Sequence, residues 1–295
     1  MVGVIAFCMT LVEEYLLEKK SEYTILLLNE DTSIAYAYFY WVSFSLICAL
    51  IAVILTVYVG PGAMGSGVPE VMGLLNGVNY PKAIDISTLV VKIIGVEFAV
   101  IGNLAIGKEG PLVHIGAIIG AMTPYIPFSI FESFRNDMDK RTFMAAGSSA
   151  GVSAAFGAPI GGALFSYEIS KPNTFWTFGM LWRVFFSSAI STLTLGLLSE
   201  MKSGAPLTLN SSAVLKFGKI SYFDTPMTDL LIAIILGTIC GLLGAFFICV
   251  YAILGFFRKK FIDSKLKKVL EVVLFSMISA SIFFWLSAAC MDCNP

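Results

Sequence analysis

The sequence predicts an all-α protein that crosses a membrane several times, and three observations support this class. Of the 295 residues, 57% are hydrophobic, and the mean hydropathy is +0.85. Only 13% are charged, about half the usual share. A soluble chain of this length could not bury so much apolar surface. The net charge of -1 gives no reason to expect a nucleic-acid partner.

Four apolar runs are long enough to cross a bilayer, at residues 35–59, 175–198, 229–256 and 269–289. A helix rises about 1.5 Å per residue, so each run can cross a hydrocarbon core of about 30 Å. Gly237, Gly241 and Gly244 give the third run a small-residue face for packing. Residues 1–16 lack the basic start and cleavage site of a signal peptide, so we expect them to belong to a span.

Two hydrophilic stretches, 132–142 and 257–268, predict loops. The second holds six Lys or Arg against one Asp, so the positive-inside rule places it in the cytosol. Residues 201–226 and 290–295 are then expected on the opposite, lumenal or extracellular side.

Three residues agree with that orientation. Asn210 begins a glycosylation sequon within 201–226. Cys290 and Cys293 form one C-x-x-C pair, and no second Cys or His pair completes a zinc site. The two cysteines are either incidental or a disulfide on the oxidising side.

Between residues 61 and 172 the apolar pieces are short, and glycine and proline interrupt them repeatedly. Irregular backbone inside a membrane is tolerated only where protein or a watery cavity receives it. Interrupted segments therefore indicate a transport pathway.

Three of these breaks share one pattern, in which glycines precede a proline and an apolar helical run. They lie at 65–70, 107–111 and 151–168. Proline suits the first turn of a helix, where its missing N–H is not needed. The free N–H groups and positive dipole end of such a helix form an anion site.

At the first break, Ser66 can donate its hydroxyl to an anion beside the N–H groups of Gly67 and Val68, or serve only as an N-cap. At the second, Lys108 and Glu109 form a charge pair between apolar segments. An intramembrane carboxylate is a functional candidate, and Glu109 could occupy the place of an anion. The alternative is a capping carboxylate in a surface loop.

The third break is rich in small residues, so helix packing explains it as well as an anion contact does. Glu168 there could simply be a carboxylate at a helix end, and His114 is more typical of a hydrogen-bonded packing residue. No Ser/His/Asp set, metal cluster or Walker loop is present. We therefore expect no enzyme activity, no metal and no cofactor.

These breaks resemble the signatures of the CLC family of voltage-gated chloride channels and chloride/proton exchangers. The resemblance rests on Gly65–Pro69, on Gly107–Pro111 with His114, on Ala154–Phe165, and on the strings "LNGV", "DKRTFMAAGSSAGVSAAFGAP" and "MDCNP". It covers nearly the whole chain and is closest to the endosomal, lysosomal and vacuolar branch.

The resemblance implies a CLC-type fold with broken, re-entrant helices, chloride transport, and a homodimer in one of those membranes. The transported ion is chloride, with protons and membrane lipid as further partners. Anion-binding residues would be Ser66 with its neighbours Gly65, Gly67, Gly107, Lys108 and Gly110. Glu109 matches the gating glutamate, which in exchangers also carries the proton.

Two departures from the family pattern bear on function. The resemblance implies that exchangers of this branch usually carry two consecutive Glu residues at this position. The second of them takes protons from the cytosol. Here the pair reads Glu168-Ile169, and an aliphatic side chain cannot relay a proton. This favours a channel, although Glu168 could substitute as a proton relay.

The second departure is length. By this resemblance, residues 1–200 match the first inverted repeat, with its first helix cut short at Met1. Residues 201–226 match a loop, and residues 227–295 match the start of the second repeat. The CBS domains of the family have no match in this sequence. The alternative to a chloride-transporting subunit is a truncated, non-conducting subunit that associates only with full-length partners.

Overall fold

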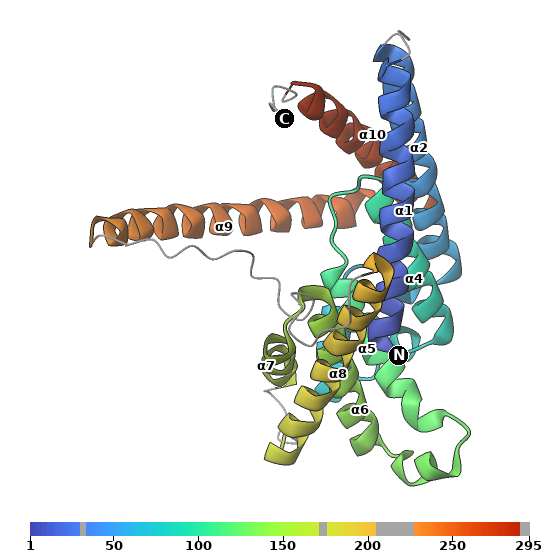
Figure 1. Cartoon of the computed structure of the whole chain (residues 1–295), viewed down its shortest axis with the longest axis vertical. Coiled ribbons are helices and arrows are strands. Elements are labelled where there is room, and N and C mark those ends of the chain that lie inside the picture. Colours follow the sequence, from blue (N-terminus) through green and yellow to red (C-terminus); the bar gives the residue numbers. More distant parts are fainter. Residues whose placement is uncertain (30–33, 171–175, 205–226, 290–295) are drawn as a thin grey trace. The chain divides into compact units, whose positions relative to one another are not determined.

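The computed structural model describes residues 1–29, 34–170, 176–204 and 227–289, and this part consists of helices and turns without a strand (Figure 1). Most of the expected loop 201–226, with Asn210, lies outside the described residues, as do Cys290 and Cys293. The chain divides into two compact units, Met1–Lys216 with Glu271–Pro295, and Phe217–Leu270.

The first unit contains α1 (Val2–Asn29), α2 (Ile34–Ile54), α3 (Val68–Leu75), α4 (Ile86–Ile101), α5 (Glu109–Met122), α6 (Asp137–Phe156), α7 (Pro159–Ser170), α8 (Phe178–Ser203) and most of α10 (Lys265–Ala289). The second unit contains α9 (Met227–Phe261) and the start of α10. The short helices α3, α5 and α7 begin at the three predicted glycine-proline breaks, which confirms the broken-helix pattern.

Four helices of the described chain are long and apolar enough to cross a membrane, at Ile34–Val59, Phe178–Ser203, Asp229–Phe261 and Lys265–Ser287. They match the four predicted runs. Helix α1 contains the apolar residues 1–16 but is not among these four, because charged residues follow one another from Glu13 to Glu22.

Both predicted loops are wrong in extent. Helix α6 already begins at Asp137, because the side chain of Asn136 caps it by accepting a 2.8 Å hydrogen bond from the N–H of Asp139. Within the second unit, only residues 262–264 separate α9 from α10. The cluster of Arg and Lys at the end of α9 suits the negative end of a helix dipole.

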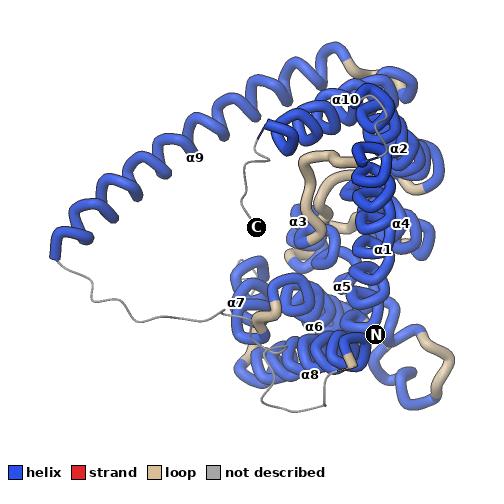
Figure 2. The backbone as a smooth tube through the Cα atoms, turned by 45° about the horizontal axis from the view of Figure 1, so that its top comes forward, coloured by secondary structure: helices blue, strands red, loops and turns tan. Residues whose placement is uncertain are grey.

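Helix α5 is the centre of the first unit and is buried from Pro111 to Ala121. It separates two apolar clusters, one with α3, α6, α7 and α8 and the other with α1, α4 and α6. Gly116 and Gly147 let the backbones of α5 and α6 touch, because a Cβ at either position would overlap the other's carbonyl oxygen. Figure 2 shows these two helices side by side.

Small hydroxyl side chains join α6 to α8. Ser187 and Ser191 donate to the carbonyl oxygens of Ala146 and Ala150, both at 3.0 Å, and the hydroxyls of Ser149 and Ser188 bond to each other. Because these serines are small, the two helices approach closely while each of the four hydroxyls has a partner.

In the second unit, α9 is one continuous helix that is exposed along its described length. Ideal Cβ atoms placed on Gly237, Gly241 and Gly244 meet no atom within 4 Å. Among the described residues of the second unit, the predicted packing face of these glycines therefore has no partner.

Candidate functional site

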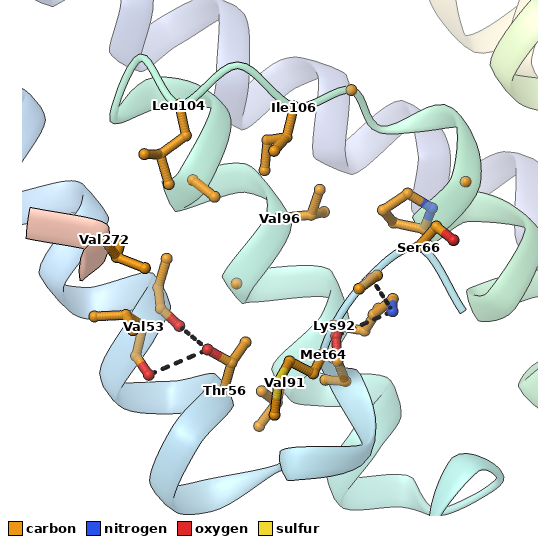
Figure 3. A pocket seen from close by; sticks show the side chains of 18 of the residues that line it. Val53, Thr56, Met64, Ser66, Val91, Lys92, Val96, Leu104, Ile106 and Val272 are labelled. Carbon is orange, nitrogen blue, oxygen red and sulfur yellow. Dashed lines mark hydrogen bonds between the residues drawn. The ribbon is translucent and has the colours of Figure 1, made fainter. Parts of the chain in front are cut away.

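The starts of α3 and α5 meet at one cleft of about 510 Å³ in the first unit (Figure 3). Its walls are mostly apolar and come from α2, α4 and the two helix starts. The polar side chains that line it are those of Thr56, Ser66, Lys92 and Glu109.

The α3 start depends on two glycines in the left-handed region. Gly65 has φ +75° and Gly67 has φ +82°, a conformation that side chains with a Cβ avoid. A Cβ on Gly67 would also overlap the ring of His114. This turn places Ser66 in the lining of the cleft. Gly67 is buried and does not line the cleft.

Ser66 is not the N-cap of α3, because Gly67 holds that position and no side chain caps the helix. The Oγ of Ser66 accepts a long hydrogen bond of 3.4 Å from the N–H of Val68. The hydroxyl hydrogen is not used by any acceptor that the described residues supply, so it remains available to an anion in the cleft.

The α5 start lies directly against Ser66. A Cβ on Gly110 would come within 2.8 Å of Ser66 Cβ, so only glycine permits this approach. The first intrahelical bond runs from Leu112 N–H to Lys108 O at 3.0 Å, which leaves the N–H groups of Glu109 and Gly110 at the free end. Two positive helix ends thus converge on the cleft.

The side chain of Glu109 is exposed in the cleft and folds back over Gly107, where a Cβ would overlap its Oε2. Among the described residues, no cation pairs with this carboxylate. Glu109 is therefore held by geometry and not by a salt bridge, and its charge lies where an anion would approach the helix ends.

Lys108 differs from the other predicted anion-binding residues. Its side chain is absent from the cleft lining, and its Nζ forms a 2.5 Å ion pair with Glu13 Oε2 of α1. The structure therefore brings together Gly65, Ser66, Gly107, Glu109 and Gly110 at the cleft, whereas Gly67 and Lys108 lie behind it.

Lys92 is a cleft residue that the motifs did not indicate. It is only 3% exposed, and its Nζ donates to the carbonyl oxygens of Ala63 at 3.0 Å and Gly65 at 2.7 Å. Figure 3 shows it reaching from α4 toward the segment that ends at Ser66. A lone lysine inside the apolar run 86–101 was the signal that could have found it.

His114 is buried beneath this turn, with its Nε2 at 2.9 Å from the carbonyl oxygen of Ala83. This hydrogen bond links α5 to the segment before α4, and the ring of His114 packs against Gly67. This arrangement fits the packing role that a lone histidine in an apolar helix suggests.

Ile169 and Glu168 lie on α7, away from the cleft. Ile169 is 4% exposed and belongs to the apolar cluster that contains Val71 and Val184. Glu168, the preceding residue, is exposed. No described carboxylate takes the place of Ile169 inside this cluster.

The arrangement suits a small anion. The two helix ends, the hydroxyl of Ser66 and the buried ammonium of Lys92 all place positive potential at one apolar-walled cleft. Glu109 is the one carboxylate that lines the cleft in the described chain. Ionised, it opposes an anion; protonated or displaced, it does not.

Comparison with known proteins gives matches along most of the chain. The family model "Voltage gated chloride channel" matches residues 48–293. The human "H(+)/Cl(-) exchange transporter 7" is 36% identical over 276 residues, which cover 90% of this chain and 34% of that protein. "Chloride channel protein A" of Dictyostelium discoideum is 33% identical over 298 residues, covering 98% and 34%.

Solved structures share the fold. A slow cyanobacterial Cl-/H+ antiporter superposes with a TM-score of 0.73 at 22% identity, covering 95% of this chain and 61% of that chain. A eukaryotic CLC transporter gives 0.73 at 23% identity and covers 95% and 46%. The chain thus spans about a third of the length of the curated relatives it matches.

Proposed function

Because the chain belongs to the voltage-gated chloride channel family, the CLC family, we propose that it carries chloride across a membrane, with the cleft as the anion site and Glu109 as the gate. The observation that carries this proposal is the convergence of the α3 and α5 starts, where Gly110 lies against Ser66. The choice of chloride follows the names of the relatives, a proton/chloride exchange transporter and a chloride channel protein.

In this mechanism chloride enters the cleft and accepts hydrogen bonds from Ser66 and from the free N–H groups of the α5 start. Lys92 contributes positive charge from behind the Ser66 turn. The ionised carboxylate of Glu109 competes with chloride for the same positive region. Chloride passes when Glu109 is protonated or swings out of the cleft.

The proposal favours passive conduction over proton exchange. Ile169 occupies the position at which exchangers of the endosomal, lysosomal and vacuolar branch carry a proton-accepting Glu. Apolar side chains enclose it. The exposed Glu168 of α7 is the residue that would have to substitute for it as a relay. The name of the human relative supports the opposite reading, so the experiment measures proton movement as well.

The proposal includes assembly as a homodimer and residence in an endosomal, lysosomal or vacuolar membrane, as the resemblance implies. The alternative is a non-conducting subunit that associates with full-length partners. It is kept because the chain covers 34% of the human relative.

Reconstitution of the full chain into liposomes tests the proposal directly. Chloride efflux should exceed that of empty liposomes, and a chloride gradient should drive little proton movement. Stoichiometric proton counterflow would replace the passive reading with exchange. No efflux from correctly folded protein, together with co-purification on a longer family member, would favour the non-conducting alternative.

A further inference from the structure

The loop between α4 and α5, residues 102–108, leads directly to the start of α5 and to Glu109. Leu104, Ile106 and Gly107 of this loop line the cleft (Figure 3). Ile106 donates a 2.7 Å hydrogen bond to the carbonyl oxygen of Leu104, within the loop itself. Among the described residues, Ile106 and Gly107 have no backbone hydrogen bond to another helix. The course of the loop beside the gate therefore depends on what holds its two ends.

A buried lysine of α1 fixes the start of the loop. Lys20 is completely buried. Its Nζ donates to the carbonyl oxygen of Ile101 at 3.2 Å and to the Oγ of Ser45 on α2 at 2.8 Å. Ile101 is the last residue of α4, so this cation lies at the negative end of that helix. Ser276 of α10 donates a further bond of 3.2 Å to the carbonyl oxygen of Gly102.

The same helix holds the other end of the loop. Lys108 Nζ forms the 2.5 Å ion pair with Glu13 Oε2, and the two side chains are only 29% and 17% exposed. Solvent therefore screens this pair less than it would a fully exposed one. Glu13 precedes Lys20 by seven residues, close to two helical turns, so both lie on one face of α1, about 10 Å apart along its axis. Helix α1 thus contacts both ends of the loop.

The chain between the two anchors is longer than the distance that it has to bridge. The seven residue steps from Ile101 to Lys108 would extend to about 23 to 25 Å, roughly twice the distance of about 10 Å between the two positions on α1. Chain connectivity alone therefore does not fix the course of the loop, and the two side-chain anchors do. If the anchor at Lys108 is released, Gly107 and Glu109 can shift without any movement of α4.

We propose that α1 positions the gate through Glu13 and Lys20, which hold the two ends of the loop 102–108. The Glu13–Lys108 pair then keeps the carboxylate of Glu109 at the positive helix ends of the cleft. Glu13 and Lys20 are positioning residues, because they act on chloride only through Glu109. When the pair breaks, the α5 start loses its tether to α1, and the carboxylate spends less time at the helix ends.

Hydrogen exchange of the reconstituted full chain tests the two anchors and needs no transport, whereas their effect on chloride rests on the proposed function. Glu13→Gln should speed exchange of the Leu112 amide, whose bond to the carbonyl oxygen of Lys108 is the first of α5. Lys20→Met should instead speed exchange of the Gly102 amide, which is bonded at the end of α4. Each change should be at least about twofold, as expected for the loss of one contact between coupled residues.

Glu14→Gln is the matched control for this measurement. Glu14 is the neighbour of Glu13 on α1, and it forms its own 2.5 Å ion pair with Lys202 of α8, away from the loop. Its replacement should leave exchange of the Leu112 amide unchanged. Equal acceleration of this amide in Glu13→Gln and Glu14→Gln, or none in either, would overturn the proposal. Glu13 is partly exposed, so this comparison remains decisive even if Lys20→Met fails to fold.

Chloride efflux measured against pH tests the action on the gate. At pH 7, Glu13→Gln and Lys108→Met should both raise efflux at least about twofold, because each breaks the same pair. The two substitutions change the net charge in opposite directions. A purely electrostatic effect on chloride would therefore raise efflux in one variant and lower it in the other. At acidic pH, where Glu109 is protonated, both variants should converge on the wild type.

The Glu109→Gln background shows whether the effect passes through the gate. Glu13→Gln should have no further effect on efflux there, because the carboxylate that it positions is absent. An effect of the same size in both backgrounds, or opposite changes in Glu13→Gln and Lys108→Met, would refute the action on the gate. Absence of chloride efflux from the wild type would refute the proposed function and this action together, while hydrogen exchange still decides whether α1 holds the loop.

Discussion

The ammonium group of Lys92 on α4 donates a 2.7 Å hydrogen bond to the carbonyl oxygen of Gly65, the residue directly before Ser66. A second bond of 3.0 Å reaches the carbonyl of Ala63. Both carbonyl dipoles therefore point at a buried cation. Lys92 both orients the turn and supplies charge.

Replacing Lys92 with Met should weaken chloride binding about tenfold, or by about 1.4 kcal/mol. The reason is that the cleft loses its buried cation and the Ala63 and Gly65 carbonyls lose their donor. Calorimetric titration with chloride measures the effect. Lys202→Met, which breaks the exposed pair with Glu14, is the control, and equal losses in the two variants would argue against a local role for Lys92.

Gly107→Ala should lower the apparent affinity for chloride. The new Cβ would occupy the place of Glu109 Oε2, and the carboxylate would move into the adjoining cleft, where it competes with the anion. The dependence of efflux on chloride concentration measures this change.

A double-variant cycle isolates the cause of that change. In a Glu109→Ala background, the Gly107→Ala substitution should have little further effect, because no carboxylate remains to be displaced. The same loss in both backgrounds would show that the alanine perturbs the α5 start itself.

The sequence predicted the parts of this site that are local in the chain. A glycine-proline break specifies its own helix start, so the motifs around Ser66 and Glu109 were sufficient to predict the α3 and α5 starts. The partner of Lys108 is 95 residues away in the chain, and neither spacing nor motif indicates which helix faces it. For this reason the sequence predicts Lys108 to be an anion-binding residue.

Lys92 escaped prediction for the same reason. It is a charged residue of the apolar run 86–101, which also contains Glu97. The role of Lys92 depends on which groups the neighbouring helices bring to it. The start of α6 was missed on other grounds: residues 132–142 have the composition of a loop, but the hydrogen bond from Asp139 N–H to the Asn136 side chain begins a helix there.

Ile169→Glu should destabilise the protein by on the order of 3 kcal/mol or more, because the carboxylate would enter an apolar cluster without a partner. It should not create proton exchange. Thermal unfolding in detergent and proton movement in liposomes give the two measurements.

Glu168→Gln is the matched control for this change. Its side chain is exposed, so stability should change by no more than about 0.5 kcal/mol. A stable Ile169→Glu variant that moves protons against a chloride gradient would contradict the expectation and show that one position decides between conduction and exchange.

Glu109→Gln should raise chloride efflux at neutral pH and remove most of its pH dependence. An ionised carboxylate about 4 Å from chloride opposes it by about 4 kcal/mol at an effective dielectric constant of about 20, and the amide has no such charge. Protonation of the wild-type carboxyl has the same effect, so wild-type efflux should rise toward the level of the variant as pH falls. Efflux measured across a pH series in both proteins checks this, and parallel profiles of unchanged steepness would show that the gate lies elsewhere.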